Sequence, residues 1–124
     1  MKTYQKKDSG VTDYSKMSDF EINLQVAITI GGFVDEEILH EEKTIFKHHG
    51  NSQYTAFDPC NSWADSGPII ASNRIMLNPY CADELWKAEF PVIDDGFMKT
   101  YAVNYDKNPL RAAMIVFLMM QEDK

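Results

Sequence analysis

Five side chains of this sequence could act as soft or borderline metal ligands. They are His40, His48, His49, Cys60 and Cys81. Zinc sites use closely spaced ligand pairs, whereas these two cysteines stand alone in the sequence. The two adjacent histidines would point to opposite faces of a strand. The spacing therefore does not favour a metal site, and a polar turn that carries two histidines is the simpler interpretation.

Cys60 could also be a nucleophile. It precedes an expected helix start, where the positive end of the helix dipole lowers the pKa of a thiol. A nucleophilic cysteine needs a base as well, and the histidines lie far away in the sequence with no triad-like signature. A structural cysteine is the favoured interpretation.

Paired carboxylates are a further kind of catalytic group. Asp58 and Asp65 flank Trp63, and Asp94 is followed directly by Asp95. Some hydrolases place two acids across a cleft, but acids beside proline or glycine are common in turns and helix caps. Phosphate-binding and dinucleotide-binding motifs are absent from the sequence. The sequence therefore predicts no catalytic residue, no cofactor and no metal site.

Aromatic and methionine side chains point to protein recognition instead. Tyrosine and tryptophan anchor interfaces, and methionine adapts to irregular partners. The stretch from Leu110 to Met120 is apolar almost all round, so it is either central to the core or half exposed at an interface. We expect an exposed side from Ile115 to Met120. The predicted interaction residues are Trp63, Asp65, Arg111, Met119 and Met120.

Arg111 stands near the expected start of the last helix. The helix dipole favours anions at that position, so an arginine there needs a carboxylate partner. The favoured interpretation places this partner within the fold, and the alternative places it on another chain.

Helix signals are found at three places along the chain. Ser18 to Glu21 fits a capping box, followed by Phe20, Leu24, Ala27 and Ile28 at helical spacing and by a Gly-Gly stop. Residues 63–71 could form a short helix, although Pro68 weakens that prediction. Asn108 and Pro109 are suited to the N-cap and the first position of the final helix.

Strand signals are short and antiparallel in type. Residues 44–46 and 53–57 are predicted as strands around a turn, and residues 74–77 as a strand that Asn78-Pro79 ends. Residues 85–90 and 99–105 alternate and flank a turn at 94–96, which predicts a hairpin. We expect Tyr101, Val103 and Tyr105 to share one face of it. The acidic stretch 35–42 is predicted as a solvated loop with a short helical turn.

Size and charge limit the possible classes of protein. The chain has 124 residues and a net charge of −7, which suits one domain and argues against direct nucleic-acid binding. Its longest apolar run is far shorter than the roughly 20 residues that cross a bilayer. The lysine-containing start has no apolar signal segment, so a cytoplasm with reduced thiols is expected. Residues 1–12 are predicted as a flexible extension and residues 13–124 as a single α+β domain.

Three blocks of sequence resemble one known family. Residues 13–23, 57–70 and 108–122 are similar, in this order, to the NinX family of lambdoid phages and prophages. The second block, Trp86 and the final helix also resemble phage α-β-α sandwich domains. The resemblance implies a small antiparallel sheet flanked by helices, with helices near both ends of the chain. It implies a phage or prophage origin and expression in the cytoplasm of a bacterial host, and it brings no catalytic residues with it.

The sequence leaves three functional hypotheses open. The first is a non-enzymatic module that binds a host or phage protein, with self-association through the last helix as one form of this. The second is an acidic inhibitor that mimics DNA toward a host nuclease or another defence component. Its acids would be Asp35, Glu36, Glu37, Glu41, Glu42, Asp83, Glu84, Asp94 and Asp95. The third is a small enzyme.

Overall fold

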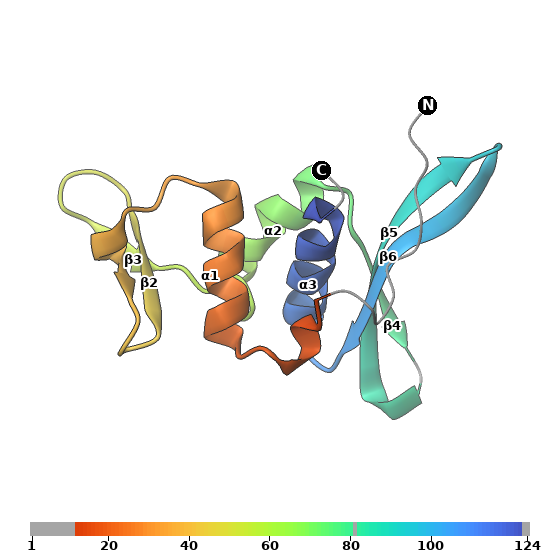
Figure 1. Ribbon diagram of the computed structural model, residues 1–124, viewed down its shortest axis with the longest axis horizontal. Helices are drawn as coiled ribbons and strands as arrows, with labels where there is room; N and C mark the ends of the chain where they lie inside the picture. The colour runs from red at the N-terminus through yellow and green to blue at the C-terminus, as the bar shows by residue number, and fades with distance from the viewer. Residues whose placement is uncertain (1–11, 81, 123–124) are drawn as a thin grey trace.

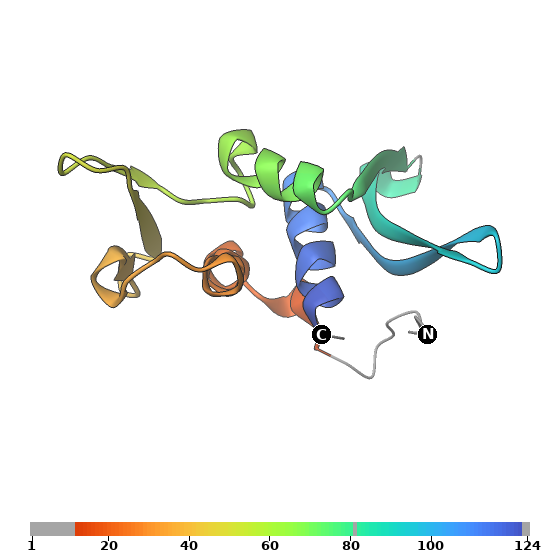
Figure 2. The same cartoon turned by 90° about the horizontal axis from the view of Figure 1, so that it is seen from above.

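The protein is elongated, with a small sheet at each end and helices between them (Figure 1). The computed structural model describes residues 12–80 and 82–122, so nearly all of the predicted N-terminal extension lies outside the described residues. The α+β class, with antiparallel strands and a helix near each end of the described chain, is confirmed. The strands form two sheets, and the helices lie between these sheets rather than around one of them (Figure 2).

The first helical segments show how the chain begins. A short 3-10 helix, η1 (Tyr14–Lys16), leads into α1 (Asp19–Ile30). The predicted capping box is confirmed, because the Ser18 side chain accepts from the N–H of Glu21 and the Glu21 carboxylate accepts from that of Ser18. The buried face of α1 differs from the predicted one. It carries Ile22, Asn23, Val26 and Ala27, whereas Ile28 is exposed.

The first sheet is small and follows a second 3-10 helix, η2 (Asp35–Glu37). Strands β1 (Ile38–Leu39), β2 (Thr44–His48) and β3 (Tyr54–Ala56) are antiparallel in the order β1-β2-β3. The two predicted strands and the short helical turn are therefore confirmed. β3 is an edge strand, and all of its residues are exposed.

Helix α2 (Trp63–Ser72) forms although it contains Pro68. Ser62 caps it by accepting from the backbone N–H of Asp65. Pro68 cannot donate to the carbonyl of Ala64, one turn earlier. Both residues are exposed, so solvent can satisfy that carbonyl, and the predicted helix is confirmed.

The second sheet has the order β4-β5-β6 and contains the predicted hairpin. Its strands are β4 (Met76–Tyr80), β5 (Leu85–Asp94) and β6 (Phe97–Asp106), and η3 (Ala82–Glu84) precedes β5. β4 continues through Pro79, so the expectation that Asn78-Pro79 ends this strand is wrong. Proline is tolerated there because β4 is an edge strand.

The face pattern predicted for β6 is also wrong. A bulge near Tyr101 shifts the register, so that Phe90 pairs with Ala102 and Ala88 with Asn104. Tyr101 and Ala102 are both buried as a result. Tyr105 lies on the opposite face and is exposed, because a one-residue shift moves alternate side chains to the other side of a sheet.

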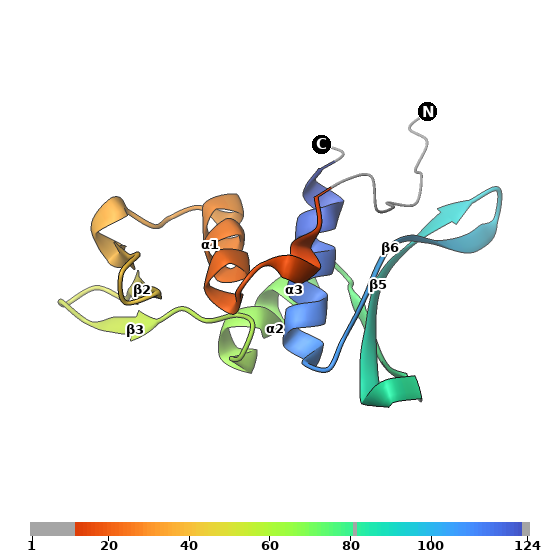
Figure 3. The same cartoon turned by 60° about the horizontal axis from the view of Figure 1, so that its bottom comes forward.

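Helix α3 (Pro109–Gln121) is the centre of the core. It packs against α1 and α2 as well as β5 and β6, and Figure 3 shows it between the other helices and the second sheet. Residues Ala112 to Leu118 are all buried, so the expectation of an exposed side from Ile115 to Met120 is wrong. A helix that is apolar all round is covered here by helices on one side and a sheet on the other.

Candidate functional site

Arg111 is the centre of a polar network that ties the start of α3 to the N-terminal region. Its Nη1 donates to Asp19 at 2.8 Å and its Nε donates to Asp106 at 3.1 Å. Its Nη2 donates to the carbonyl oxygen of Met17 at 2.7 Å. The Arg111 side chain is only 12% exposed. The predicted carboxylate partner within the fold is therefore confirmed, and Arg111 has two.

Asn23 joins the second sequence block to this network. It is buried in α1, donates to Asp58 at 2.7 Å, and accepts from the backbone N–H of Cys60 at 3.0 Å. The Asn61 side chain donates to both Asp19 and Asp58. The backbone N–H of Asp58 in turn donates to the Asp65 carboxylate at 2.9 Å. Asp58 and Asp65 thus hold the loop before α2 in place, in agreement with the turn and cap roles expected for these acids.

Asn108 closes the network from the third block. Its side-chain oxygen accepts from the backbone N–H groups of Leu110 and Arg111, which confirms the predicted N-cap. Its amide group donates to the carbonyl oxygen of Cys60 at 2.6 Å and to the Asn61 side chain at 3.2 Å. We call this network the Arg111 hub. It consists of Asp19, Asn23, Asp58, Cys60, Asn61, Asp106, Asn108 and Arg111.

Cys60 is a structural residue of this hub. Its side chain is buried in the core, and burial raises the pKa of its thiol to about 12. The negative charges of Asp19 and Asp58 act in the same direction. A nucleophilic cysteine needs the opposite shift. The favoured structural interpretation of Cys60 is therefore supported by the geometry.

The candidate metal ligands within the described residues are not brought together. The ring of His40 packs edge-on against Phe20, the ring of His48 stacks on Tyr54, and His49 bonds to the Thr55 hydroxyl. Cys81 lies outside the described residues. Within residues 12–80 and 82–122, no group of three His, Cys, Asp or Glu side chains has the geometry of a metal site.

The predicted interaction residues have very different environments. Trp63, at the first turn of α2, is 60% exposed and is free to meet another molecule. Met120 is buried and Met119 is half buried. Asp65 and Arg111 are occupied by bonds within the fold. Among these predicted residues, Trp63 offers the most accessible side chain.

The tip of the β5–β6 hairpin is a surface that the sequence reasoning missed. β4 pairs with β5 only as far as Glu89, so beyond this point β5 and β6 continue as a ribbon of two strands, and the tip of this ribbon projects from the body (Figure 1). Near its end, Ile93, Phe97 and Met98 are 72%, 71% and 65% exposed. The alternation of the hairpin was visible in the sequence, but the end of β4 decides which part of it is covered.

The register places these apolar side chains on both faces of the ribbon. Ile93 pairs directly with Met98, so these two share one face, whereas Phe97 pairs with Asp94 on the other. The protein's own body could cover one face at most. Asp95 and Gly96 form the two-residue turn, both with positive φ, as the predicted turn requires.

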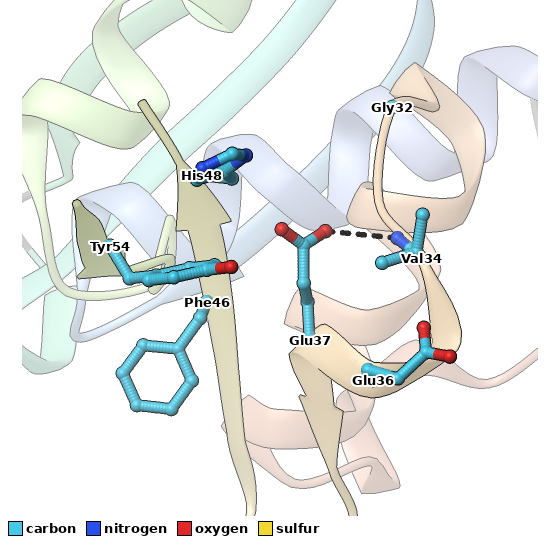
Figure 4. A pocket seen from close by; sticks show the side chains of 7 residues that line it. All are labelled: Gly32, Val34, Glu36, Glu37, Phe46, His48 and Tyr54. Atoms are coloured by element: carbon cyan, nitrogen blue, oxygen red, sulfur yellow. Dashed lines mark hydrogen bonds between the residues drawn. The ribbon is translucent and has the colours of Figure 1, made fainter. Parts of the chain in front are cut away.

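A pocket of about 700 Å³ lies at the opposite end of the molecule (Figure 4). Its walls come from the α1–η2 connection, η2, β2 and β3. The lining residues are Gly32, Val34, Glu36, Glu37, Phe46, His48 and Tyr54. Glu37 was expected in a solvated loop, but it is buried, and its Oε1 accepts from the backbone N–H of Val34 at 2.9 Å. The three-residue spacing between these two was the only signal in the sequence for this bond.

The acids of the DNA-mimic hypothesis are divided between distant parts of the molecule. The η2 acids belong to the end with the first sheet, and the acids of the β5–β6 turn belong to the far end of the hairpin (Figure 1). Glu37 is also withdrawn from the surface. A mimic of DNA must present a continuous row of negative charges to the basic groove of its target, so this distribution does not favour the mimic.

The fold and its surfaces define a small α+β protein with a bonded polar centre and exposed apolar and aromatic groups at its two ends. The chain belongs to the family described as Bacteriophage P22, NinX, whose model matches residues 13–121. It is therefore a phage accessory protein, as the three sequence blocks implied. The search of curated proteins found no match. In the described part of the chain, no helix is long and apolar enough to cross a membrane.

Proposed function

We propose that this protein is a non-enzymatic interaction module that binds a host or phage protein through the tip of its β5–β6 hairpin. The observation that carries the proposal is the exposure of Ile93, Phe97 and Met98 on a ribbon that projects beyond the sheet. Two-stranded hairpins are marginal in water when nothing packs on them. When a partner covers large apolar side chains at such a place, their removal from water favours binding.

The geometry of the tip favours insertion into a partner's groove. Apolar side chains project from both faces of the ribbon, so a flat surface would cover only some of them. An ion pair between Lys99 and Asp94, at 3.1 Å, lies on the same face of the ribbon as Phe97. Charged groups around an apolar centre are the usual arrangement of a protein interface.

A non-enzymatic role is supported by the state of the chemical groups. Asp58, Asp65 and Cys60, which were candidates for catalysis, are engaged in hydrogen bonds that hold the loop before α2 and the start of α3 in place. We propose further that the protein acts in the cytoplasm of the bacterial host. Membership of a phage accessory family supports this place of action.

The proposal is tested by affinity capture from lysate of a phage-infected bacterial host at low and at high salt. The wild-type chain is compared with a tip variant that carries Phe97→Thr and Met98→Thr. The matched control is Ile28→Thr, which changes a similarly exposed apolar residue on α1. We expect a protein that is retained at both salt concentrations by the wild type and the control, and lost with the tip variant. Trp63→Ala is the second control.

Each outcome distinguishes the hypotheses. Equal retention by the wild type and the tip variant would overturn the proposal, and loss with Trp63→Ala alone would move the interface to α2. A protein held only at low salt would favour the acidic inhibitor instead. Light scattering on the same samples shows whether a second copy of the chain is the partner.

A further inference from the structure

The pocket of Figure 4 combines a buried carboxylate with a wall of aromatic side chains. We propose that it binds the guanidinium group of an arginine side chain, presented by an extended segment of a partner protein. This site is at the end of the molecule remote from the hairpin tip, so the proposal does not depend on the proposed function (Figure 1).

The charge of the pocket favours a cation. Glu36 and Glu37 line it, and none of its lining residues is a lysine or arginine. Lys47 lies between Phe46 and His48 on β2, and alternation directs its side chain to the other face of the strand. Taking a carboxylate out of water without a cationic partner costs free energy. A bound cation offsets part of this cost.

Glu37 is held in place to receive such a cation. The residue is only 9% exposed, and its Oε1 is occupied by the backbone N–H of Val34. Figure 4 shows its other oxygen turned toward the side of the pocket where His48 and Tyr54 lie. The bond to Val34 fixes the carboxylate, so little side-chain entropy is lost when the second oxygen accepts from a ligand.

The aromatic wall distinguishes guanidinium from a simple ammonium group. The rings of His48 and Tyr54 stack with centroids 4.7 Å apart and planes 24° from parallel. Phe46 adds a third ring from the same face of β2. A guanidinium ion is planar, weakly hydrated and able to stack on aromatic faces while it donates to a carboxylate. An ammonium ion would gain the charge interaction but lose the stacking.

The adjacent strand supports an extended polypeptide as the source of the arginine. Tyr54 begins β3, whose residues are all exposed and which pairs with β2 on one side only among the described strands. An unpaired strand edge offers backbone donors and acceptors to a further strand. A segment added at this edge would bring one of its side chains to the level of Tyr54.

The experiment uses the full chain labelled with ¹⁵N and the peptide acetyl-Thr-Val-Arg-Val-Thr-amide. Matched peptides replace the arginine by citrulline, which is a neutral group of the same shape, or by lysine. We expect the arginine peptide to shift the amide signals of Gly32, Val34, Glu37 and Tyr54. We expect the citrulline peptide to bind at least about tenfold more weakly, because it lacks the charge.

Variants of the protein locate the site. Glu37→Gln should weaken the arginine peptide at least about tenfold, and Tyr54→Leu should weaken it while preserving the carboxylate. The matched control is Glu41→Gln, because Glu41 is exposed and does not line the pocket. Thermal melting of each variant shows that it is folded, and Tyr54→Leu serves as the test if Glu37→Gln unfolds.

Several results would overturn the proposal. They are equal binding of the citrulline peptide, unchanged affinity in both pocket variants, signal shifts confined to other parts of the protein, and no shift at millimolar peptide. Equal binding of the lysine and arginine peptides would overturn the assignment to guanidinium, because the aromatic wall would then contribute nothing specific.

Discussion

The Arg111 hub and the hairpin tip are opposites in how their side chains are used. In the hub, almost every polar group has a partner, and a single arginine joins two carboxylates and a carbonyl oxygen. At the tip, large apolar side chains lie in water on both faces of a ribbon. The comparison indicates that the charged groups of the hub stabilise this fold, whereas the groups that the tip offers to a partner are apolar.

This comparison also shows what the sequence could and could not predict. Local rules were sufficient for the capping box at Ser18, the Asn108 cap and the Asp95-Gly96 turn, because each depends on a few neighbouring residues. The partner of Arg111 was expected from the helix dipole alone. Asp19 was not named, because 92 residues separate it from Arg111 and only the tertiary fold brings them together.

The surfaces were harder to predict for the same reason. The last helix was assigned a half-exposed side, since a stripe of apolar residues does not show how many neighbours cover it. Nor does alternation in β5 and β6 show where β4 stops or where a bulge changes the register. Both surfaces proposed for binding follow from such tertiary details.

The first prediction is the largest and concerns Arg111. Arg111→Met should lower the free energy of unfolding by about 2–3 kcal/mol, because it leaves Asp19 and Asp106 without their cation. The value is below that of a fully buried pair, since the Asp19 side chain is 45% exposed. Urea unfolding followed by circular dichroism measures it.

Two controls make this prediction specific. Lys16→Gln removes the exposed ion pair between Lys16 and Asp13 and should leave the free energy of unfolding nearly unchanged, because water already screens the two charges. Arg111→Lys should be more stable than Arg111→Met but less stable than the wild type, because an ammonium group lacks the planar set of N–H donors that reaches several acceptors at once. If Arg111→Met were as stable as wild type, the hub would not be the part that holds the fold together.

The second prediction concerns the Asn108 cap. Asn108→Ala should lower the free energy of unfolding by about 1–2 kcal/mol, because it removes the acceptor for two backbone N–H groups of α3. Asn108→Ser retains a capping oxygen but loses the donor to the Cys60 carbonyl. Its free energy of unfolding should therefore lie between those of the wild type and Asn108→Ala. Thermal unfolding of the three chains tests this order, and equal melting of Ala and Ser variants would contradict it.

The third prediction uses the raised pKa of Cys60. Above pH 9 the thiol of the unfolded chain loses its proton, whereas the folded thiol retains it until a pKa of about 12. Alkaline pH therefore favours the unfolded state, and the stability present below pH 9 falls as pH rises. Between pH 8 and pH 10 the wild type should lose about 1 kcal/mol more than Cys60→Ala. Equal losses would show that Cys60 is not sealed within the hub.

The fourth prediction is the smallest and separates the two regions most sharply. Phe97→Thr and Met98→Thr together should change the free energy of unfolding by less than about 0.5 kcal/mol, because both side chains are exposed and threonine suits a strand. The same variant should lose the binding partner, so function and stability would separate. A loss above about 1 kcal/mol would mean that the ribbon packs with the core in solution. The tip would then resemble the hub, and its apolar side chains would no longer indicate a binding surface.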